Sequence, residues 1–336
     1  MKRRKGAVFA VFAAFAALLI SLQPVGAFAA AASVPLPEER PVTYAQREAY
    51  KEELFCHAGV YRTGETALRY RYYLPEEAEG APLVLFLHGS GERGDDNDSQ
   101  LNNAVLRPFI EDENSPFYSA AVVAPQCPAK EGGDGWVDLR ANGYEVYENY
   151  SVDEVAESAE CRALVGLVQE MLSRYALDAG RVYVIGVSQG AVATWDLLAR
   201  HGELFAAAVP IAGVGDVSRA EVYAEIPIYA FHGEQDTIVP YESGTPRLYE
   251  AVDAVGEGKM NFVSFTDGAH DIWEQSIVYA GGEGMPSLAE WLFSRRREEA
   301  SPSAWPWVAA ACAAAAVAAV AACIALLVRR RKRESA

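Results

Sequence analysis

The stretch VYVIGVSQG, residues 182–190, decides the fold of this chain. Its first six residues are an apolar run rich in β-branched side chains, and a helical pattern follows over residues 191–200. The sequence therefore predicts a buried strand that turns sharply into a helix. Ser188 lies on that turn, at the centre of a G-x-S-x-G pattern. Gly186 and Gly190 carry no side chain, so strand and helix can pack closely while the serine stands exposed above the sheet.

Apolar runs alternate with helical patterns on both sides of this turn. Buried strands are predicted at residues 82–87, 120–124, 182–187, 206–211, 226–231 and 259–265. Helices are predicted at residues 44–54, 152–175, 191–200, 242–255 and 288–296. Residues 55–62 and 67–74 also resemble strands, and the second run alternates and ends at Pro75, as an antiparallel edge strand does. The alternation predicts an α/β fold, in which helices cover both faces of a mostly parallel sheet.

Both ends of the chain have the composition of targeting segments. Residues 1–29 combine a basic start, a short apolar run and an A-x-A-like cleavage pattern, which predicts a signal peptide. Residues 307–328 form a run without one charge, long enough to cross a hydrocarbon layer about 30 Å thick. The basic tail, residues 329–336, follows at once. The positive-inside rule then predicts a single-pass protein of the cell membrane with an extracellular body.

The body between these segments is predicted to be one large domain, residues 54–298. We expect residues 30–53 to be an entry segment, which is Ala/Pro-rich and loose over residues 30–41, and residues 299–306 to be a stalk. Without the two charged ends the chain has 20 basic and 45 acidic residues, a net charge of about −25. Such a charge argues against nucleic acid as a partner. The body contains three cysteines, so it can hold at most one internal disulfide; they are Cys56, Cys127 and Cys161.

Ser188 needs help to act as a nucleophile, because a serine hydroxyl is a poor one near neutral pH. It needs a base that takes its proton and a carboxylate that holds the base in the right tautomer. Asp236 and His270 each follow a predicted strand, and we expect them to supply these two groups. Glu234 is the strongest rival to Asp236, since it is in the same loop.

His88 and His232 are the other histidines at strand ends. Each precedes a glycine, and hydrogen bonding to the turn backbone is the more common role there.

A tetrahedral intermediate also needs two N–H donors at its oxyanion, worth ~3 kcal/mol each. The backbone of Gln189 is predicted to supply one. The glycine-rich turn HGSGERG, residues 88–94, is predicted to supply the other at Ser90. Trp136 and Trp273 are candidate substrate-binding residues, because aromatic side chains often line ligand pockets.

Two segments have weak metal or phosphate patterns. The turn at residues 88–94 lacks the Gly-Lys-Ser/Thr of a phosphate-binding loop. The acidic run at residues 95–99 lacks the Gly and the distal Glu of an EF-hand, so a solvated loop is the better interpretation. We therefore expect no metal and no cofactor.

Six segments carry a family resemblance: LFLHGSGERGDDN (85–97), VAPQCP (123–128), VIGVSQGAVATW (184–195), residues 205–213, AFHGEQDTIVP (230–240) and GAHDIW (268–273). In this order they resemble α/β-hydrolases of the carboxylesterase/phospholipase, dienelactone-hydrolase and polyhydroxybutyrate-depolymerase-like group, some of which are labelled predicted peptidases. The resemblance covers about residues 54–297. It implies the α/β-hydrolase fold, with Ser188 as nucleophile, Asp236 as orienting acid and His270 as base. Relatives usually have Met-Gly-Gly after the nucleophile, whereas Gln189-Gly190-Ala191 here makes the pocket floor more polar.

The function predicted from the sequence is that of a membrane-anchored extracellular serine hydrolase. It cleaves a small-molecule, carbohydrate-linked or lipid-linked carboxylic ester through an acyl-enzyme. A prolyl-oligopeptidase-like peptidase is the first alternative, although the chain has no segment resembling the large gating domain of such enzymes. The second alternative is a catalytically idle surface binding protein, and the presence of Ser188, Asp236 and His270 argues against it.

Overall fold

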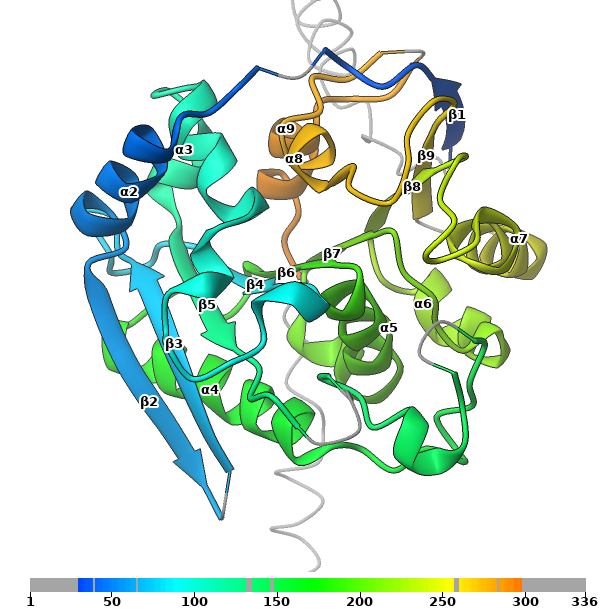
Figure 1. Cartoon of the computed structure of the whole chain (residues 1–336), viewed down its shortest axis with the longest axis horizontal. Coiled ribbons are helices and arrows are strands. Elements are labelled where there is room, and N and C mark those ends of the chain that lie inside the picture. The colour runs from blue at the N-terminus through cyan, green and yellow to red at the C-terminus, as the bar shows by residue number, and fades with distance from the viewer. Residues whose placement is uncertain are drawn as a thin grey trace, which may run out of the picture. The chain divides into compact units, whose positions relative to one another are not determined.

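A nine-stranded sheet forms the centre of the fold in the computed structural model, with strand order β1-β9-β8-β7-β6-β4-β5-β3-β2 (Figure 1). The structure describes residues 30–297, apart from residues 39, 65, 131–134, 146–147, 257–259 and 283. The strands are β1 (Ala30–Val34), β2 (His57–Thr63), β3 (Thr66–Tyr73), β4 (Leu83–Leu87), β5 (Ala121–Gln126), β6 (Val182–Val187), β7 (Ala207–Ile211), β8 (Ile228–Gly233) and β9 (Met260–Phe265).

Neighbouring strands are parallel from β1 across to β5, and β3 is antiparallel to both β5 and β2. The six parallel strands from β4 to β9 are buried on both faces, which explains why most of them are continuous apolar runs in the sequence. In β4, Leu83, Leu85 and Leu87 belong to one apolar cluster. Val84 and Phe86, between them in sequence, belong to a second cluster on the other face of the sheet.

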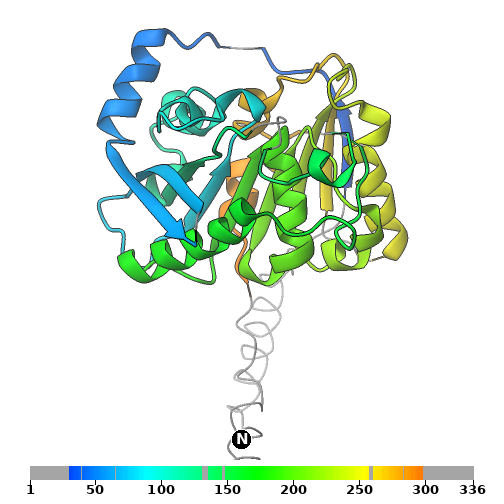
Figure 2. The same ribbon diagram turned by 60° about the horizontal axis from the view of Figure 1, so that its bottom comes forward.

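Helices cover both faces of this sheet. They are α2 (Tyr44–Glu53), α3 (Arg107–Glu111), α4 (Ala159–Tyr175), α5 (Gln189–His201), α6 (Ala220–Ala224), α7 (Thr245–Val255), α8 (Trp273–Ile277) and α9 (Leu288–Phe293). Residues of α4, α5, α6 and α7 belong to the first apolar cluster, and residues of α3, α8 and α9 to the second. In Figure 2 the green and yellow helices lie in front of the sheet and the orange α9 lies behind it. The predicted α/β architecture, with a mostly parallel sheet between two helical layers, is confirmed.

The helix predicted at residues 44–54 is confirmed, whereas the start of the chain's described part is not the loose segment that its composition predicts. Residues 30–34 form β1, which pairs in parallel with β9. The helix α2 begins with a capping box, in which the Thr43 hydroxyl accepts from the Gln46 backbone N–H at 3.2 Å. On the same helix, the buried Lys51 forms an ion pair with Asp98 at 2.9 Å. This segment is part of the folded domain, because backbone pairing joins β1 to β9 and an ion pair joins α2 to the loop of Asp98.

Two further expectations about the elements are wrong. Strand β3 is antiparallel but is not an edge strand, since β2 pairs with it along its outer side. The helix predicted from residue 152 begins instead at Ala159, where the Ser158 hydroxyl accepts from the Cys161 backbone N–H at 2.9 Å. Before that cap the chain makes a turn, which is closed by a hydrogen bond from the Glu154 backbone N–H to the Ser151 carbonyl at 3.0 Å. A capping serine thus outweighs the apolar periodicity on its N-terminal side.

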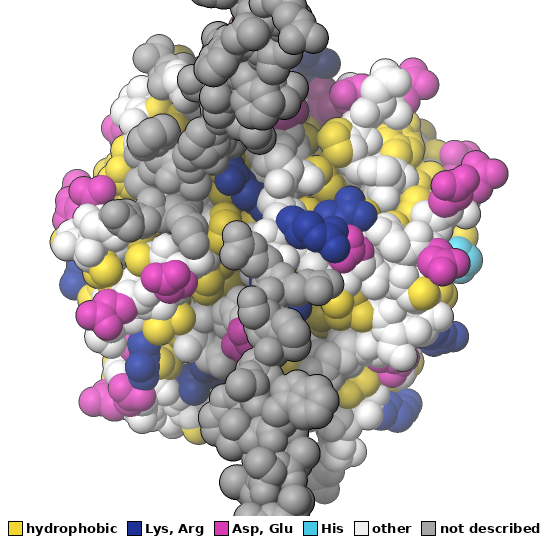
Figure 3. Space-filling view, turned by 180° about the vertical axis from the view of Figure 1, so that it is seen from behind, with side chains coloured by type: hydrophobic (Ala, Val, Ile, Leu, Met, Phe, Trp, Pro, Cys, Tyr) yellow, Lys and Arg dark blue, Asp and Glu magenta, His cyan; other side chains and the backbone are white. Residues whose placement is uncertain are grey.

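Charged side chains are spread over the surface. Figure 3 shows carboxylates scattered over one face, with Lys and Arg side chains among them.

In the acidic run at residues 95–99, the Asp96 carboxylate accepts from the backbone N–H groups of Asp98 and Ser99 at 2.8 and 2.9 Å, and from the Gln126 amide at 2.8 Å. Partial burial raises the pKa of Asp96, but these hydrogen bonds outweigh it and hold that pKa below its usual range. The carboxylate therefore closes a turn.

The predicted signal peptide (1–29), stalk (299–306), membrane helix (307–328) and basic tail (329–336) all lie outside the described residues. Within the described part of the chain, no helix combines the length and the apolar character that a membrane span requires. The three cysteines of the body are free, with Cys56 exposed and Cys127 and Cys161 buried.

Candidate active site

Ser188 lies on a strained turn between β6 and α5. Its backbone has φ 54° and ψ −117°, a region that residues with a side chain rarely adopt. A Cβ atom on Gly190 would lie 2.0 Å from the Leu87 carbonyl oxygen, and one on Gly186 would lie 2.1 Å from the Gly190 carbonyl oxygen. Both positions therefore require glycine. This packing holds the serine at the carboxyl end of the parallel sheet.

The three residues predicted to act together do meet in the structure. The Ser188 hydroxyl lies 2.9 Å from Nε2 of His270, and Nδ1 of His270 lies 2.7 Å from Oδ2 of Asp236. Ser188, Asp236 and His270 follow β6, β8 and β9, and the loops after parallel strands share one edge of the sheet. In this arrangement the serine O–H donates to the imidazole and the imidazole N–H donates to the carboxylate.

Asp236 is buried, and its carboxylate has several donors. Its Oδ1 atom accepts from the backbone N–H groups of Ile238 and Val239, both at 2.9 Å. Its Oδ2 atom lies 3.3 Å from Nε2 of His232, in addition to its contact with His270. Burial raises the pKa of Asp236, but hydrogen bonds from the two imidazoles outweigh burial and hold that pKa well below its usual range. The carboxylate is therefore ionised at neutral pH.

Glu234, the rival carboxylate in the same loop, has other partners. Its Oε1 atom accepts from the hydroxyl groups of Ser33 and Ser264, both at 2.6 Å. Ser33 belongs to β1 and Ser264 to β9, so this side chain is directed towards the edge of the sheet. The structure thus brings Asp236, and not Glu234, to His270.

Two backbone N–H groups beside Ser188 are available to an oxyanion. A Cβ atom on Gly89 would lie 3.4 Å from Cβ of Ser188, so the turn after β4 lies against the serine. Ser90 and Gln189 each occupy the first position of a helical turn, where the N–H has no partner within the helix. Among the described residues neither N–H donates a hydrogen bond. The assignment of these two N–H groups to the oxyanion stays a prediction.

His88 and His232 support turns, as the sequence interpretation expected. Nε2 of His88 accepts from the Cys127 backbone N–H at 2.9 Å, and its Nδ1 donates to the Gly89 carbonyl at 2.7 Å. Complete burial lowers the pKa of His88 to about 4, so the ring is neutral at physiological pH. His232 lies 2.9 Å from the Thr245 hydroxyl through Nδ1, and its Nε2 donates to the Val239 carbonyl at 3.0 Å.

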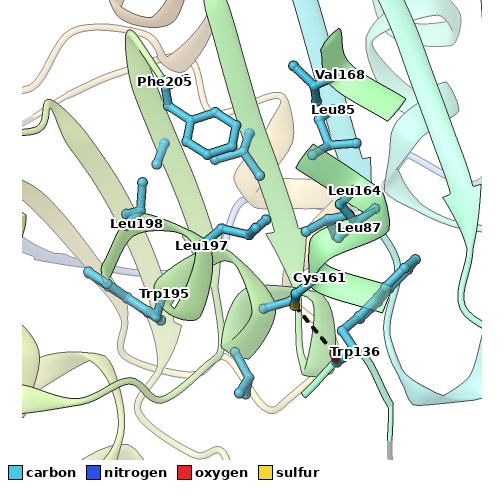
Figure 4. Close-up of a cluster of buried hydrophobic side chains, with 14 of the residues drawn as sticks. Leu85, Leu87, Trp136, Cys161, Leu164, Val168, Trp195, Leu197, Leu198 and Phe205 are labelled. Atoms are coloured by element: carbon cyan, nitrogen blue, oxygen red, sulfur yellow. Dashed lines mark hydrogen bonds between the residues drawn. The ribbon is translucent and has the colours of Figure 1, made fainter. Parts of the chain in front are cut away.

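The two tryptophans predicted to contact substrate lie in different environments. Trp136 is only 1% exposed, and its indole N–H donates to the His88 carbonyl at 3.1 Å. Figure 4 shows it among apolar core side chains, with the Cys161 thiol directed to its backbone carbonyl. The expectation of a ligand contact at Trp136 is therefore wrong, because the ring fills the space between the turn after β4 and α4. Trp273 is half-buried and packs edge-on against His270, with ring centroids 5.2 Å apart.

Sequence reasoning missed the contact of His232 with the acid and the cleft beside the acid loop. The spacing of His232 and Asp236, four residues apart after one strand, was the available signal. The cleft has a volume of about 580 Å³ and adjoins Ile238, which is 53% exposed. Its lining residues are Arg140, Glu145, Glu148, Asn149, Ile238, Pro240, Ser243 and Arg247.

Comparisons with known proteins show which family the chain resembles. The family model described as Phospholipase/Carboxylesterase matches residues 74–280, a range that includes Ser188, Asp236 and His270. The chain is 29% identical over 243 residues to "Putative esterase NocK" of Nocardia uniformis subsp. tsuyamanensis, covering 69% of this chain and 58% of that protein. It is 24% identical over 209 residues to Acyl-protein thioesterase 1 of Debaryomyces hansenii, covering 59% of this chain and 87% of that protein.

Among solved structures, one titled "Crystal Structure of a Thermostable Esterase" superposes with a TM-score of 0.60 and 30% sequence identity. The match covers 72% of this chain and 63% of that chain. The chain thus spans less than two thirds of the length of this esterase and of the Nocardia relative. The resemblance seen in the sequence is nevertheless confirmed, since the family model covers more than half of the chain. The chain belongs to the Phospholipase/Carboxylesterase family of α/β-hydrolases.

Proposed function

We propose that the chain is a serine hydrolase that cleaves carboxylic esters through an acyl-enzyme. The observation that carries this proposal is the hydrogen-bonded series from the Ser188 hydroxyl through His270 to the ionised Asp236. A nucleophile within hydrogen-bond reach of a base, and a base oriented by a carboxylate, is the arrangement that acyl transfer requires.

The reaction begins when the Ser188 hydroxyl attacks the ester carbonyl carbon. His270 takes the hydroxyl proton through Nε2, and the carboxylate of Asp236 stabilises the imidazolium that forms. The N–H groups of Ser90 and Gln189 donate to the oxyanion of the tetrahedral intermediate. His270 then gives its proton to the departing alcohol oxygen. A water molecule, deprotonated by the same imidazole, releases the acid and restores the serine.

Esters of small molecules, carbohydrates or lipids are the proposed substrates. The names of the relatives support an acyl substrate, because an esterase, a thioesterase and a bifunctional acetylxylan esterase/xylanase are among them. The half-buried Trp273 lies beside His270, and we assign it to the wall of the substrate site.

The proposed location is the cell membrane, with the catalytic domain outside the cell. It is supported by the composition of residues 1–29 and by the uncharged run at residues 307–328 with its basic tail.

A fluorophosphonate probe, which labels an activated serine covalently, tests the proposed nucleophile. The wild-type chain should be labelled and Ser188→Ala should not be, while Ser119→Ala should be labelled like the wild type. Ser119 is exposed and its hydroxyl bonds only the Pro116 carbonyl, so it is a matched control. Circular dichroism of Ser188→Ala should match that of the wild type. Labelling of the folded Ser188→Ala variant at the wild-type rate would refute the assignment.

A further inference from the structure

Residues 33–36, the last two residues of β1 and the two that follow it, make side-chain and backbone contacts with both loops of the proposed site. The Ser33 hydroxyl donates to Oε1 of Glu234 at 2.6 Å, and Glu234 lies two residues before Asp236. The Leu36 backbone N–H donates to Oδ1 of Asp267 at 2.6 Å, and Asp267 lies three residues before His270. Both carboxylates thus accept hydrogen bonds from residues 33–36. Their contacts connect the loops to the edge of the sheet.

Backbone pairing continues into the same region. The Thr266 N–H donates to the Val34 carbonyl at 2.9 Å, one residue beyond the end of β9. Glu234 also accepts from Ser264 of β9 at 2.6 Å, so its one oxygen joins β1, β9 and the loop after β8. A carboxylate with two hydroxyl donors at this distance makes strong, charge-assisted hydrogen bonds.

The two loops are also fixed to each other. The Gln235 N–H donates to the Gly268 carbonyl and the Glu234 N–H to the Phe265 carbonyl, both at 2.9 Å. Close packing allows little independent motion, since a Cβ atom on Gly233 would lie 2.2 Å from the Ala269 carbonyl oxygen. Backbone hydrogen bonds and close packing therefore join the loops of Asp236 and His270 to each other, and residues 33–36 contact both loops.

We propose that residues 33–36, Glu234 and Asp267 act as an N-terminal clamp that positions Asp236 and His270 for proton transfer from Ser188. The inference rests on the proposed function, since it gives these residues a role in the alignment of the triad. They are positioning residues, because none of them touches the reacting atoms. Removing either carboxylate breaks a hydrogen bond between residues 33–36 and one of the two loops. A displacement of about 1 Å in such a site costs on the order of a hundredfold in rate.

Substitutions of the two carboxylates in the full-length chain test the clamp. Glu234→Ala and Asp267→Ala remove the acceptors and should each lower kcat by about tenfold to a hundredfold, with KM unchanged. Glu234→Gln and Asp267→Asn keep a carbonyl oxygen in the same place and should retain most of the wild-type kcat. Glu242→Ala removes an exposed carboxylate nearby and should leave kcat unchanged. Wild-type kcat in both alanine variants would overturn the clamp.

A second measurement separates positioning from a general loss of structure. In the His270→Ala background, the residual kcat no longer depends on where the base lies, so adding Glu234→Ala should have no further effect. An equal loss of kcat in both backgrounds would overturn the clamp and assign Glu234 a structural role alone. Fluorophosphonate labelling of the alanine variants distinguishes this result from failure of the proposed function. Labelled but slow variants keep the nucleophile, whereas an unlabelled wild-type chain would refute the hydrolase itself.

Discussion

The Nε2 atom of His232 lies 3.3 Å from the Oδ2 atom of Asp236, so the acid of the proposed triad has an imidazole neighbour besides its base. His232 is fully buried, and the Thr245 hydroxyl and the Val239 carbonyl hold its ring. Burial raises the pKa of Asp236, and the imidazoles of His232 and His270 together with the Val239 backbone N–H lower it. A histidine outside the triad thus helps to keep the pKa of the acid below its usual range.

This contact predicts how stability depends on pH. The pKa of Asp236 is lower in the folded protein than in the unfolded chain, so ionised Asp236 stabilises the fold above about pH 4. That contribution is lost as the pH falls from there towards the folded pKa. In His232→Leu the pKa of Asp236 should be closer to its usual value than in the wild type. When the pH is lowered from about 5 to about 3, the unfolding free energy of this variant should therefore fall less than that of the wild type. Urea unfolding across this range measures it, with the exposed His57→Leu as control. Identical slopes in wild type and His232→Leu would contradict the prediction.

The second prediction separates the two carboxylates of the acid loop. Asp236→Asn should lower kcat by about 10⁴-fold, the cost seen in a serine protease when the orienting carboxylate becomes an amide. Glu234→Gln should have a small effect, because the amide oxygen still accepts from Ser33 and Ser264. Steady-state kinetics on one ester substrate compares the two variants. If Glu234→Gln lost more kcat than Asp236→Asn, the assignment of Asp236 as the orienting carboxylate would be wrong.

A third prediction concerns His88, whose pKa burial lowers to about 4. Between that value and about 6.5, the value for an unfolded chain, the unfolded state binds more protons than the folded state. The unfolding free energy should therefore rise with pH over this window, with the full contribution present above about 6.5. His88→Asn should remove most of that slope. Chemical denaturation at several pH values between about 4 and 7 provides the measurement, and an unchanged slope in the variant would exclude His88 as its source.

The fourth prediction is that ester cleavage greatly outpaces amide cleavage. An amide has a resonance-stabilised ground state and its leaving group must be protonated as it departs, so peptidases use remote binding energy to position long substrates. For substrates with the same acyl group, kcat/KM should favour an ester over an anilide by about a hundredfold, about 2.7 kcal/mol. Equal or faster turnover of the anilide would favour the prolyl-oligopeptidase-like alternative.

The fifth prediction concerns attachment to the membrane. Residues 307–328 carry no charge and a basic tail follows them, so a chain that ends at Ser301 should be released into the medium as active enzyme. The full-length chain should remain in the membrane fraction until detergent is added. Cell fractionation with an ester assay on each fraction measures this. Full-length protein in the soluble fraction would count against a membrane span.

The residues that meet at the site were predictable because each has a strong local signal. Ser188, Asp236 and His270 each follow a buried apolar strand, and the ends of parallel strands meet at one edge of a sheet. The strand order near the site also follows from chain order, since β6, β7, β8 and β9 are neighbours in sequence and in the sheet.

What could not be predicted depends on contacts between distant parts of the chain. The residues of β1, AAASV, have a weak strand signal, and only pairing with β9 makes them a strand. Trp136 lies in an irregular segment, where an aromatic residue in the core and one in a ligand pocket have the same local pattern. In the fold its indole N–H donates to the His88 carbonyl, a contact between residues 48 positions apart that no nearby residue indicates.

The pairing of β1 with β9 also determines when the domain is completed during synthesis. Ala30 lies opposite Asn261, so β1 can join the sheet only after β9 has been synthesised. Such long-range pairing is slow compared with local helix formation. Until residue 270 has been synthesised, the growing chain contains Ser188 without its base. The proposed hydrolytic reaction therefore requires a chain synthesised at least as far as His270, and a shorter chain contains the proposed nucleophile without its base.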